Sequence, residues 1–140
     1  MATTKLRTNL EQVAQRLGVR VRTAPTPGDL WGIYDKRYKL ITIKPGLGRA
    51  QYRSTLAHEL GHAYYGHTGH HPKTERLADK WAAGKLLNFD DVLHHAKGTI
   101  DTGDLAAQLE VMPWVLETYV RTLNAGQVVE MMNELTEIYA

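Results

Sequence analysis

The sequence contains no cysteine among its 140 residues, and its apolar runs are short. Without cysteine, disulfide bonds and thiolate-ligated metal sites are excluded. No run approaches the roughly 18 apolar residues that a membrane-spanning helix needs, so we expect no membrane anchor. The first ten residues, MATTKLRTNL, lack the apolar core of a secretory signal peptide. Together these absences predict a cytoplasmic protein.

Positive charge is nearly absent from the last part of the chain. Residues 1–99 hold 16 Lys and Arg and 8 Asp and Glu, a net of +8, whereas residues 100–140 hold only Arg121 and seven acids, a net of −6. Either this acidic part packs against the basic body or the body faces an acidic partner, and we favour internal packing. Because DNA recognition needs cationic side chains on phosphates and bases, we expect no direct DNA binding by this part.

The chain does contain a strong metal-binding pattern. Residues 58–62 read HELGH, an H-E-x-x-H sequence. In a helix, His58 and His62 lie one turn apart on one face, so both rings can reach a single zinc ion. Glu59 follows the first ligand and lies beside the open metal position, where a carboxylate can take a proton from a water molecule.

The residues around this pattern favour a helix from Arg49 to Gly66. Leu56 and Leu60 are four apart and lie on the side opposite the two histidines. They give the helix an apolar face that can pack on a core. Gly66 is well placed to end the helix.

A third ligand is expected further along the chain, because catalytic zinc usually has three protein ligands. Residues 75–79 read ERLAD and lead into the helix-favouring run KWAAGKLL. Glu75 and Asp79 would share one face of that helix. Glu75 can then reach the metal, while Asp79 accepts the far ring N–H of a ligand histidine and fixes its tautomer.

Three histidines close to the pattern are rival ligands: His67, His70 and His71. A histidine third ligand normally follows the form H-E-x-x-H-x-x-G-x-x-H. Here Tyr65 stands at the glycine place and Thr68 at the last place, so the form is not met. Several nearby side chains stay open as candidates to stabilise an oxyanion: His67, His70, His71, Tyr64 and Tyr65.

The N-terminal half predicts a small sheet and one helix. Helical spacing extends from Thr8 to Leu17, and Val19–Thr23 alternates like a half-buried strand. Trp31–Tyr34 and Tyr38–Ile43 predict a hairpin that turns at residues 35–37. We therefore expect a small antiparallel or mixed three-stranded sheet packed on the active-site helix.

The C-terminal part predicts further helices. Two short apolar-periodic segments between Asp104 and Leu123 flank residues 111–113 and resemble a helix-turn-helix. Val128–Ala140 predicts a last amphipathic helix with an acidic outer face. Since the second short segment offers Arg121 and few other polar contacts, we interpret this part as a packing unit.

HELGH, a short loop and ERLADKWAAGKLL together resemble the ImmA/IrrE family of zinc metallopeptidases. That family is gluzincin-like, occurs in bacteria, phages and mobile elements, and is linked to cleavage of helix-turn-helix repressors. The resemblance implies zinc on His58, His62 and Glu75, with Glu59 as the general base. It also implies a protein substrate, namely a transcriptional repressor.

The sequence thus predicts an α+β, zincin-like chain that forms a single metallopeptidase domain over residues 1–140. Residues 1–99 would hold the sheet and the metal-site helices, and residues 100–140 the acidic helical part. The predicted activity is zinc-dependent cleavage of a peptide bond in a regulatory protein. The alternative is a non-catalytic zinc-containing binding module that acts as an anti-repressor by docking. Glu59 argues against that alternative, because a structural metal site does not need this carboxylate. The pattern does not separate zinc from manganese or iron.

Overall fold

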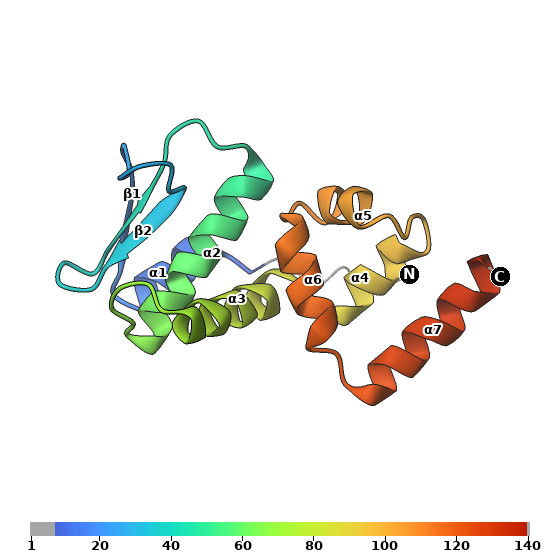
Figure 1. Ribbon diagram of the computed structural model, residues 1–140. Helices are drawn as coiled ribbons and strands as arrows, with labels where there is room; N and C mark the ends of the chain where they lie inside the picture. The colour runs from blue at the N-terminus through green and yellow to red at the C-terminus, as the bar shows by residue number, and fades with distance from the viewer. Residues whose placement is uncertain (1–7, 140) are drawn as a thin grey trace.

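The computed structural model describes residues 8–139, and in that part of the chain it contains three strands and seven helices (Figure 1). The elements are α1 (Leu10–Arg16), β1 (Arg20–Thr23), β2 (Gly32–Asp35), β3 (Leu40–Ile43), α2 (Arg49–Tyr65), α3 (Pro72–Leu86), α4 (Phe89–Ala96), α5 (Thr102–Gln108), α6 (Pro113–Arg121) and α7 (Ala125–Tyr139). The predicted α+β class is confirmed.

The sheet is mixed, with strand order β1-β3-β2. β3 pairs in parallel with β1 and antiparallel with β2, as a hairpin requires. Ile41 and Ile43 on the central strand are fully buried against α2 and its neighbours. The second hairpin arm begins at Leu40 and not at Tyr38, because Lys39 has a positive φ of 48° and cannot continue an extended strand. β2 remains at the edge of the sheet, beside α2.

Local capping explains where the N-terminal helices begin and end. α1 begins at Leu10, two residues later than expected, because the Asn9 side chain accepts a hydrogen bond from the Gln12 amide at 3.1 Å. α2 ends as expected at Gly66, which has a left-handed φ of 68°. α3 begins at Pro72, a residue that suits the first helical position.

The approach of α3 to α2 depends on one glycine. A Cβ added to Gly61 would lie 3.0 Å from the backbone Cα and O of Ala78, so the two helix backbones come close here. Gly61 and Ala78 are both fully or nearly fully buried. This contact fixes the distance between the two predicted halves of the metal site.

The C-terminal helices lie to one side of the sheet and of α2 (Figure 1). α5 and α6 flank residues 109–112, as the helix-turn-helix-like pattern predicts. α7 begins at Ala125, three residues earlier than expected, because the Asn124 side chain accepts a hydrogen bond from the Gln127 amide at 2.8 Å. The expected last residue, Ala140, lies outside the described part of the chain.

Two clusters of buried side chains stabilise the structure. One lies between the sheet, α1 and α2, and the other lies among α3 to α6. Leu86 and Trp114 pack against both clusters, so the two halves share their core at the junction of α3 and α6. No helix within residues 8–139 is long and apolar enough to cross a membrane.

The acidic part does contact the basic body. Nε of Arg49 lies 2.7 Å from Oε2 of Glu110, and Nζ of Lys97 lies 3.4 Å from Oε2 of Glu134. Arg53 donates from Nη1 to the Leu109 and Glu110 carbonyls at 3.3 and 2.6 Å. The contacts of Arg49 and Arg53 hold the turn between α5 and α6 against the first part of α2, and the Lys97–Glu134 pair joins α7 to the end of α4.

Candidate metal centre

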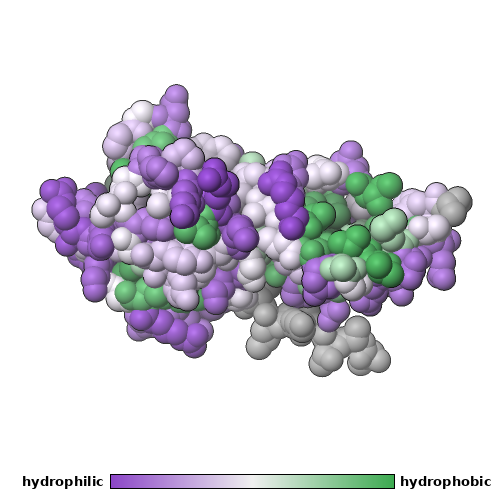
Figure 2. Space-filling model, turned by 60° about the horizontal axis from the view of Figure 1, so that its bottom comes forward, coloured by the Kyte–Doolittle hydropathy of each residue, from purple (hydrophilic) through white to green (hydrophobic). Residues whose placement is uncertain are grey.

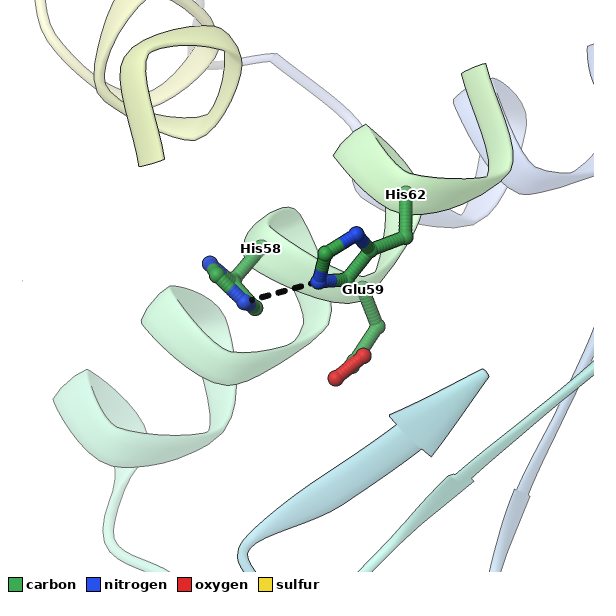
Figure 3. Close-up of side chains that lie close together, drawn as sticks. All are labelled: His58, Glu59 and His62. Atoms are coloured by element: carbon green, nitrogen blue, oxygen red, sulfur yellow. Dashed lines mark hydrogen bonds between the residues drawn. The ribbon is translucent and has the colours of Figure 1, made fainter. Parts of the chain in front are cut away.

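α2 presents its two motif histidines from one face, as the i, i+4 spacing requires (Figure 3). Nε2 of His58 and Nε2 of His62 lie 3.1 Å apart. Leu56 and Leu60 on the other side of the helix are fully buried and anchor it to the core. The helix can therefore rotate very little, and both rings are held facing the same point.

Glu75 on α3 brings a carboxylate to that point. Its Oε2 lies 2.8 Å from Nε2 of His58, and its Oε1 lies 3.0 Å from Nε2 of His62. Tetrahedral zinc, with bonds of about 2.0–2.1 Å, separates its ligand atoms by roughly 3.3 Å. The three donor groups therefore fit one zinc ion in type, in number and in spacing.

Glu59 is the second carboxylate near the histidines. One of its oxygens lies within 4.8 Å of the ligand nitrogens of both His58 and His62. Its side chain extends from α2 toward the neighbouring strand, with the carboxylate below the two rings in Figure 3. Its Cγ would lie 3.3 Å from a Cβ added to Gly32 on β2. The Glu75 carboxylate is thus the closer of the two to the Nε2 atoms of His58 and His62, and the Glu59 carboxylate lies to one side of these atoms.

The environment of Glu59 changes its acidity. The side chain is only 4% exposed. Burial raises its pKa to about 7, with a further increase from the charge of Glu75 and an opposing effect of His58 and His70. A carboxylate with a pKa near neutrality can both take up and release a proton at physiological pH.

Asp79 lies one turn beyond Glu75 and contacts the far side of the first histidine. Its Oδ1 is 2.8 Å from Nδ1 of His58. Burial lowers the pKa of His58, but the hydrogen-bonding carboxylate of Asp79 and the charges of Glu59, Asp79 and Glu75 outweigh it, so the pKa is raised. This contact favours a proton on Nδ1 and leaves Nε2 available to a metal ion.

His67 contacts the far side of the His62 ring, as Asp79 contacts the far side of the His58 ring. Its Nδ1 lies 3.0 Å from Nδ1 of His62, and its ring stacks on that of Tyr65 at 5.2 Å between centroids. Burial lowers the pKa of His62 to about 4, and the charges of His58 and His67 add to this effect. His62 is therefore neutral near pH 7, which is the form that binds metals.

The remaining candidates from the sequence have different surroundings. His70 is exposed, and its Nδ1 lies 3.1 Å from Oε1 of Glu75. Burial raises the pKa of Glu75, but hydrogen bonding to His70 and the charges of His58 and His62 lower it overall. His71 caps α3, since its Nδ1 accepts from the Lys73 amide at 3.2 Å.

The two tyrosines considered for an oxyanion contact lie away from the donor groups. Tyr64 is exposed and packs near the Trp81 ring, with centroids 5.7 Å apart. Tyr65 is also exposed and stacks on His67. Neither lines the cleft at the histidines. Neither of these two tyrosines is therefore placed to contact a group bound in that cleft.

A cleft of about 390 Å³ opens at the histidines and the two glutamates. Its walls combine polar and apolar side chains: Leu30, Trp31, Gly32, Thr55, His58, Glu59, His70, Glu75, Asp79 and Trp114. The Trp114 ring meets the His58 ring edge-on, with centroids 5.9 Å apart. Sequence reasoning did not identify Trp31 or Trp114. No local pattern marks either residue as part of a site. Trp114 reaches the cleft only because α6 packs on α3 and α2.

The turn before α6 is fixed by α2, which explains how Trp114 reaches this position. The Met112 amide donates to Oγ of Ser54 at 2.9 Å, and Ser54 is fully buried. Val115 is also fully buried. The first turn of α6 is therefore held against α2, and Trp114 closes one side of the cleft.

Comparison with protein-family models gave one match, to the IrrE N-terminal-like domain of Peptidase_M78, over residues 14–117. Neither the curated proteins nor the solved structures gave a match. The matched residues span most of the chain, and they include the sheet, α2, α3 and Trp114. The family resemblance of the HELGH and ERLAD segments is confirmed, and the chain belongs to the IrrE N-terminal-like, Peptidase_M78 family.

Proposed function

We propose that this protein is a zinc-dependent peptidase that hydrolyses a peptide bond within a protein substrate. The observation that carries the proposal is the meeting of His58, His62 and Glu75 within 3.1 Å, with the buried Glu59 beside them. Membership of a peptidase family supports it independently.

His58 and His62 would hold the zinc through Nε2, and Glu75 through its carboxylate. A bound zinc ion supplies a Lewis acid that polarises the scissile carbonyl and acidifies water at the site. Asp79 and His67 orient the two rings by contacting their Nδ1 atoms, at 2.8 and 3.0 Å respectively. Each histidine is thereby fixed in the tautomer that leaves Nε2 free as a ligand.

Glu59 is the general base of the proposed reaction. Its carboxylate takes a proton from the attacking water and delivers it to the nitrogen of the leaving amine. Burial raises the pKa of Glu59 above its ordinary value, which makes the carboxylate a stronger base toward the proton of the water. Burial also keeps bulk water away from the carboxylate during the transfer.

The substrate chain would lie along β2. In the order β1-β3-β2, the outer edge of β2 has no strand partner within residues 8–139. An extended peptide can pair with such an edge through backbone hydrogen bonds. Trp31 and Trp114 in the cleft walls then contact the side chains of that peptide. The cleft therefore favours an apolar side chain next to the scissile bond.

The substrate class follows from the family resemblance. We propose a helix-turn-helix repressor encoded by a phage or mobile element as the substrate, and the cytoplasm as the place of cleavage. The absence of cysteine is in keeping with a reducing compartment.

The test is co-expression of the protein with a candidate repressor, followed by mass spectrometry of the repressor. The variant Glu59→Gln keeps the size of the side chain and removes the base, so cleavage should fall by roughly 10²–10⁴-fold. Its zinc content should stay at the wild-type value, because Glu75 and the two histidines remain. The matched control is Glu11→Gln, which makes the same change at an exposed position on α1.

The same experiment separates the peptidase from the binding-module alternative. If Glu59→Gln retains the full regulatory effect and the repressor stays intact, the protein acts by docking and the proposed activity is wrong. If the repressor is cleaved by wild type and not by Glu59→Gln, the docking alternative is wrong.

A further inference from the structure

A second concave surface lies among the C-terminal helices, away from the metal centre. It encloses about 400 Å³ and is bordered by α4, α5, α6 and α7. Apolar side chains form most of its lining: Val92, Ala96, Ile100, Leu105, Leu116, Val120, Met131 and Leu135. Figure 2 shows the corresponding hydrophobic area on the right of the molecule, over these helices. We call this surface the C-terminal groove.

α7 forms one wall of the groove without burying its own apolar face. None of its side chains is fully buried, and Met131 and Leu135 are only partly buried. Several of its large apolar side chains are exposed: Val128, Val129, Met132, Ile138 and Tyr139. Across the groove, Ile100 and Val120 are also exposed, at 58% and 44%. Contiguous apolar surface of this kind usually marks an interaction site.

The spacing of the apolar residues along α7 indicates the shape of a partner that the groove could bind. Val128, Met131, Leu135 and Ile138 recur at intervals of three and four residues, so they line one side of the helix. Facing them, α6 contributes Leu116 and Val120, which are also four residues apart. Two helical ridges with an open floor between them form a groove that suits a third amphipathic helix.

The charge around the groove selects the kind of helix. Residues 100–140 carry seven acids and one basic residue, Arg121, a net charge of −6. Glu117 and Arg121 both line the groove itself. Acids also follow the polar side of α7, namely Glu130, Glu134 and Glu137, and of these Glu134 pairs with Lys97 at 3.4 Å. A second copy of this region would bring −6 against −6, which disfavours self-association, whereas a helix with Lys and Arg on its flanks is complementary.

We propose that the C-terminal groove binds an amphipathic α-helix of another protein, with an apolar stripe facing the groove and basic residues along its flanks. The apolar stripe covers Val120, Met131 and Leu135, and the basic flanks meet the acids of α6 and α7. Binding of this helix does not require the metal centre, so it is independent of the proposed peptidase activity.

Two synthetic helical peptides with the same leucine stripe test the proposal. One carries Lys and Arg on its polar face, and the other carries Glu at the same positions. Fluorescence anisotropy against the full chain should show the basic peptide binding at least about 10-fold more tightly. Added salt should weaken that binding, because the flanking charges are exposed.

Protein variants separate apolar docking from simple charge attraction. Ile100→Asp and Val120→Asp each add a negative charge, which by attraction alone would tighten binding of the basic peptide. If the apolar floor is the docking surface, both variants weaken it by roughly 10-fold. Tyr38→Asp is the matched control, since Tyr38 is 62% exposed between β2 and β3. The sheet lies at the other side of the molecule from the C-terminal helices (Figure 1). Tyr38→Asp should leave binding unchanged.

The proposal is overturned if the two peptides bind equally, or if Ile100→Asp and Val120→Asp bind the basic peptide as tightly as wild type. Circular dichroism of each variant checks that the helices remain folded. Analytical sedimentation of the full chain tests the other possible occupant of the groove, a second copy of this chain. A dimer that Val120→Asp dissociates assigns the groove to a second copy and overturns the proposal, whereas a monomer supports it.

Discussion

Oδ1 of Asp79 lies 2.8 Å from Nδ1 of His58, while Oε2 of Glu75 lies 2.8 Å from Nε2 of the same ring. One helix, α3, therefore contacts both nitrogens of a histidine on another helix. The four-residue spacing of Glu75 and Asp79 makes this possible, because it places both carboxylates on one face of α3.

Asp79→Ala should weaken zinc binding by roughly 10–100-fold, because the His58 ring loses the contact that fixes its tautomer. The fold should be retained, since the Asp79 side chain is 36% exposed. Competition with a chromogenic chelator measures the affinity. Asp79→Asn keeps an oxygen acceptor at the same place and should lose less zinc affinity than Asp79→Ala. Equal affinity of Asp79→Ala and wild type would show that Asp79 is only a surface acid.

His67→Leu should weaken zinc binding by about 10-fold. When His62 binds through Nε2, its Nδ1 carries the proton and donates it to Nδ1 of His67, 3.0 Å away. His67→Asn places an amide oxygen at nearly the same position and should restore much of the affinity. His94→Leu, at an exposed position on α4, is the control. If His67 were itself a ligand, Asn would fail to rescue and the loss would match that of His62→Ala.

Gly61→Ala should move α3 away from α2, because the new Cβ would lie 3.0 Å from the Ala78 backbone. We expect a loss of about 1–3 kcal/mol in the free energy of unfolding, together with weaker zinc binding as Glu75 is displaced. Urea unfolding and chelator competition measure the two effects.

Gly84→Ala is the matched control for that substitution. Gly84 is exposed within α3, and an added Cβ would meet nothing within 4 Å. Alanine there should raise stability by about 0.5–1 kcal/mol, through its better helix propensity alone. An equal response of the two variants would mean that the close approach of α2 and α3 does not depend on Gly61.

Glu59 should make the stability of the metal-free protein depend on pH. Its pKa in the folded chain, about 7, is above the ordinary value of 4.5, so folding favours the protonated form. Its stabilising contribution is complete below pH 4.5 and is lost as the pH rises through 7. Glu59→Gln should therefore match wild type near pH 4.5 and exceed it at pH 8, by up to about 3 kcal/mol.

Chemical unfolding in the presence of a chelator, at both pH values, measures this difference. The contributions of the other ionisable groups largely cancel between wild type and variant. With zinc added, the difference at pH 8 should shrink, since a nearby cation favours the carboxylate. A difference that is constant with pH would mean that the fold does not raise the pKa of Glu59.

The C-terminal helices should not bind DNA. Their net charge of −6 repels phosphates, and Arg121 is the only basic residue between 100 and 140. Fluorescence anisotropy with a labelled duplex at low salt should show no binding that depends on residues 100–140. Salt-sensitive binding that Arg121→Ala abolishes would contradict this prediction.

The sequence by itself determined the local parts of this protein. The spacing of His58 and His62, with Leu56 and Leu60 opposite them, fixes which face of α2 carries the histidines. Gly66 fixes the end of that helix through its left-handed φ. Such features depend on neighbours within one or two turns, so a local pattern is sufficient to predict them.

Only the tertiary structure decided which side chains meet across elements. The approach of α3 to α2 at Gly61 and Ala78 brings Glu75 to the shared point of the histidines and leaves Glu59 beside β2. These contacts depend on an interhelical distance that is set by buried side chains far apart in the chain. His67 meets His62 for a local reason, because the turn at Gly66 brings the His67 amide to the His62 carbonyl at 2.9 Å and the two Nδ1 atoms to 3.0 Å.

The entry of α6 into the cleft and the exposed C-terminal groove have the same origin. Trp114 reaches His58 because Ser54 on α2 holds the turn before α6, 58 residues away in sequence. The amphipathic pattern of Val128–Ala140 predicted a helix with an apolar side, and it is equally compatible with a buried and an exposed position. The contacts of α7 with α4, which include Tyr139 on the Ala96 carbonyl and Glu134 on Lys97, leave Val128, Met132 and Ile138 exposed.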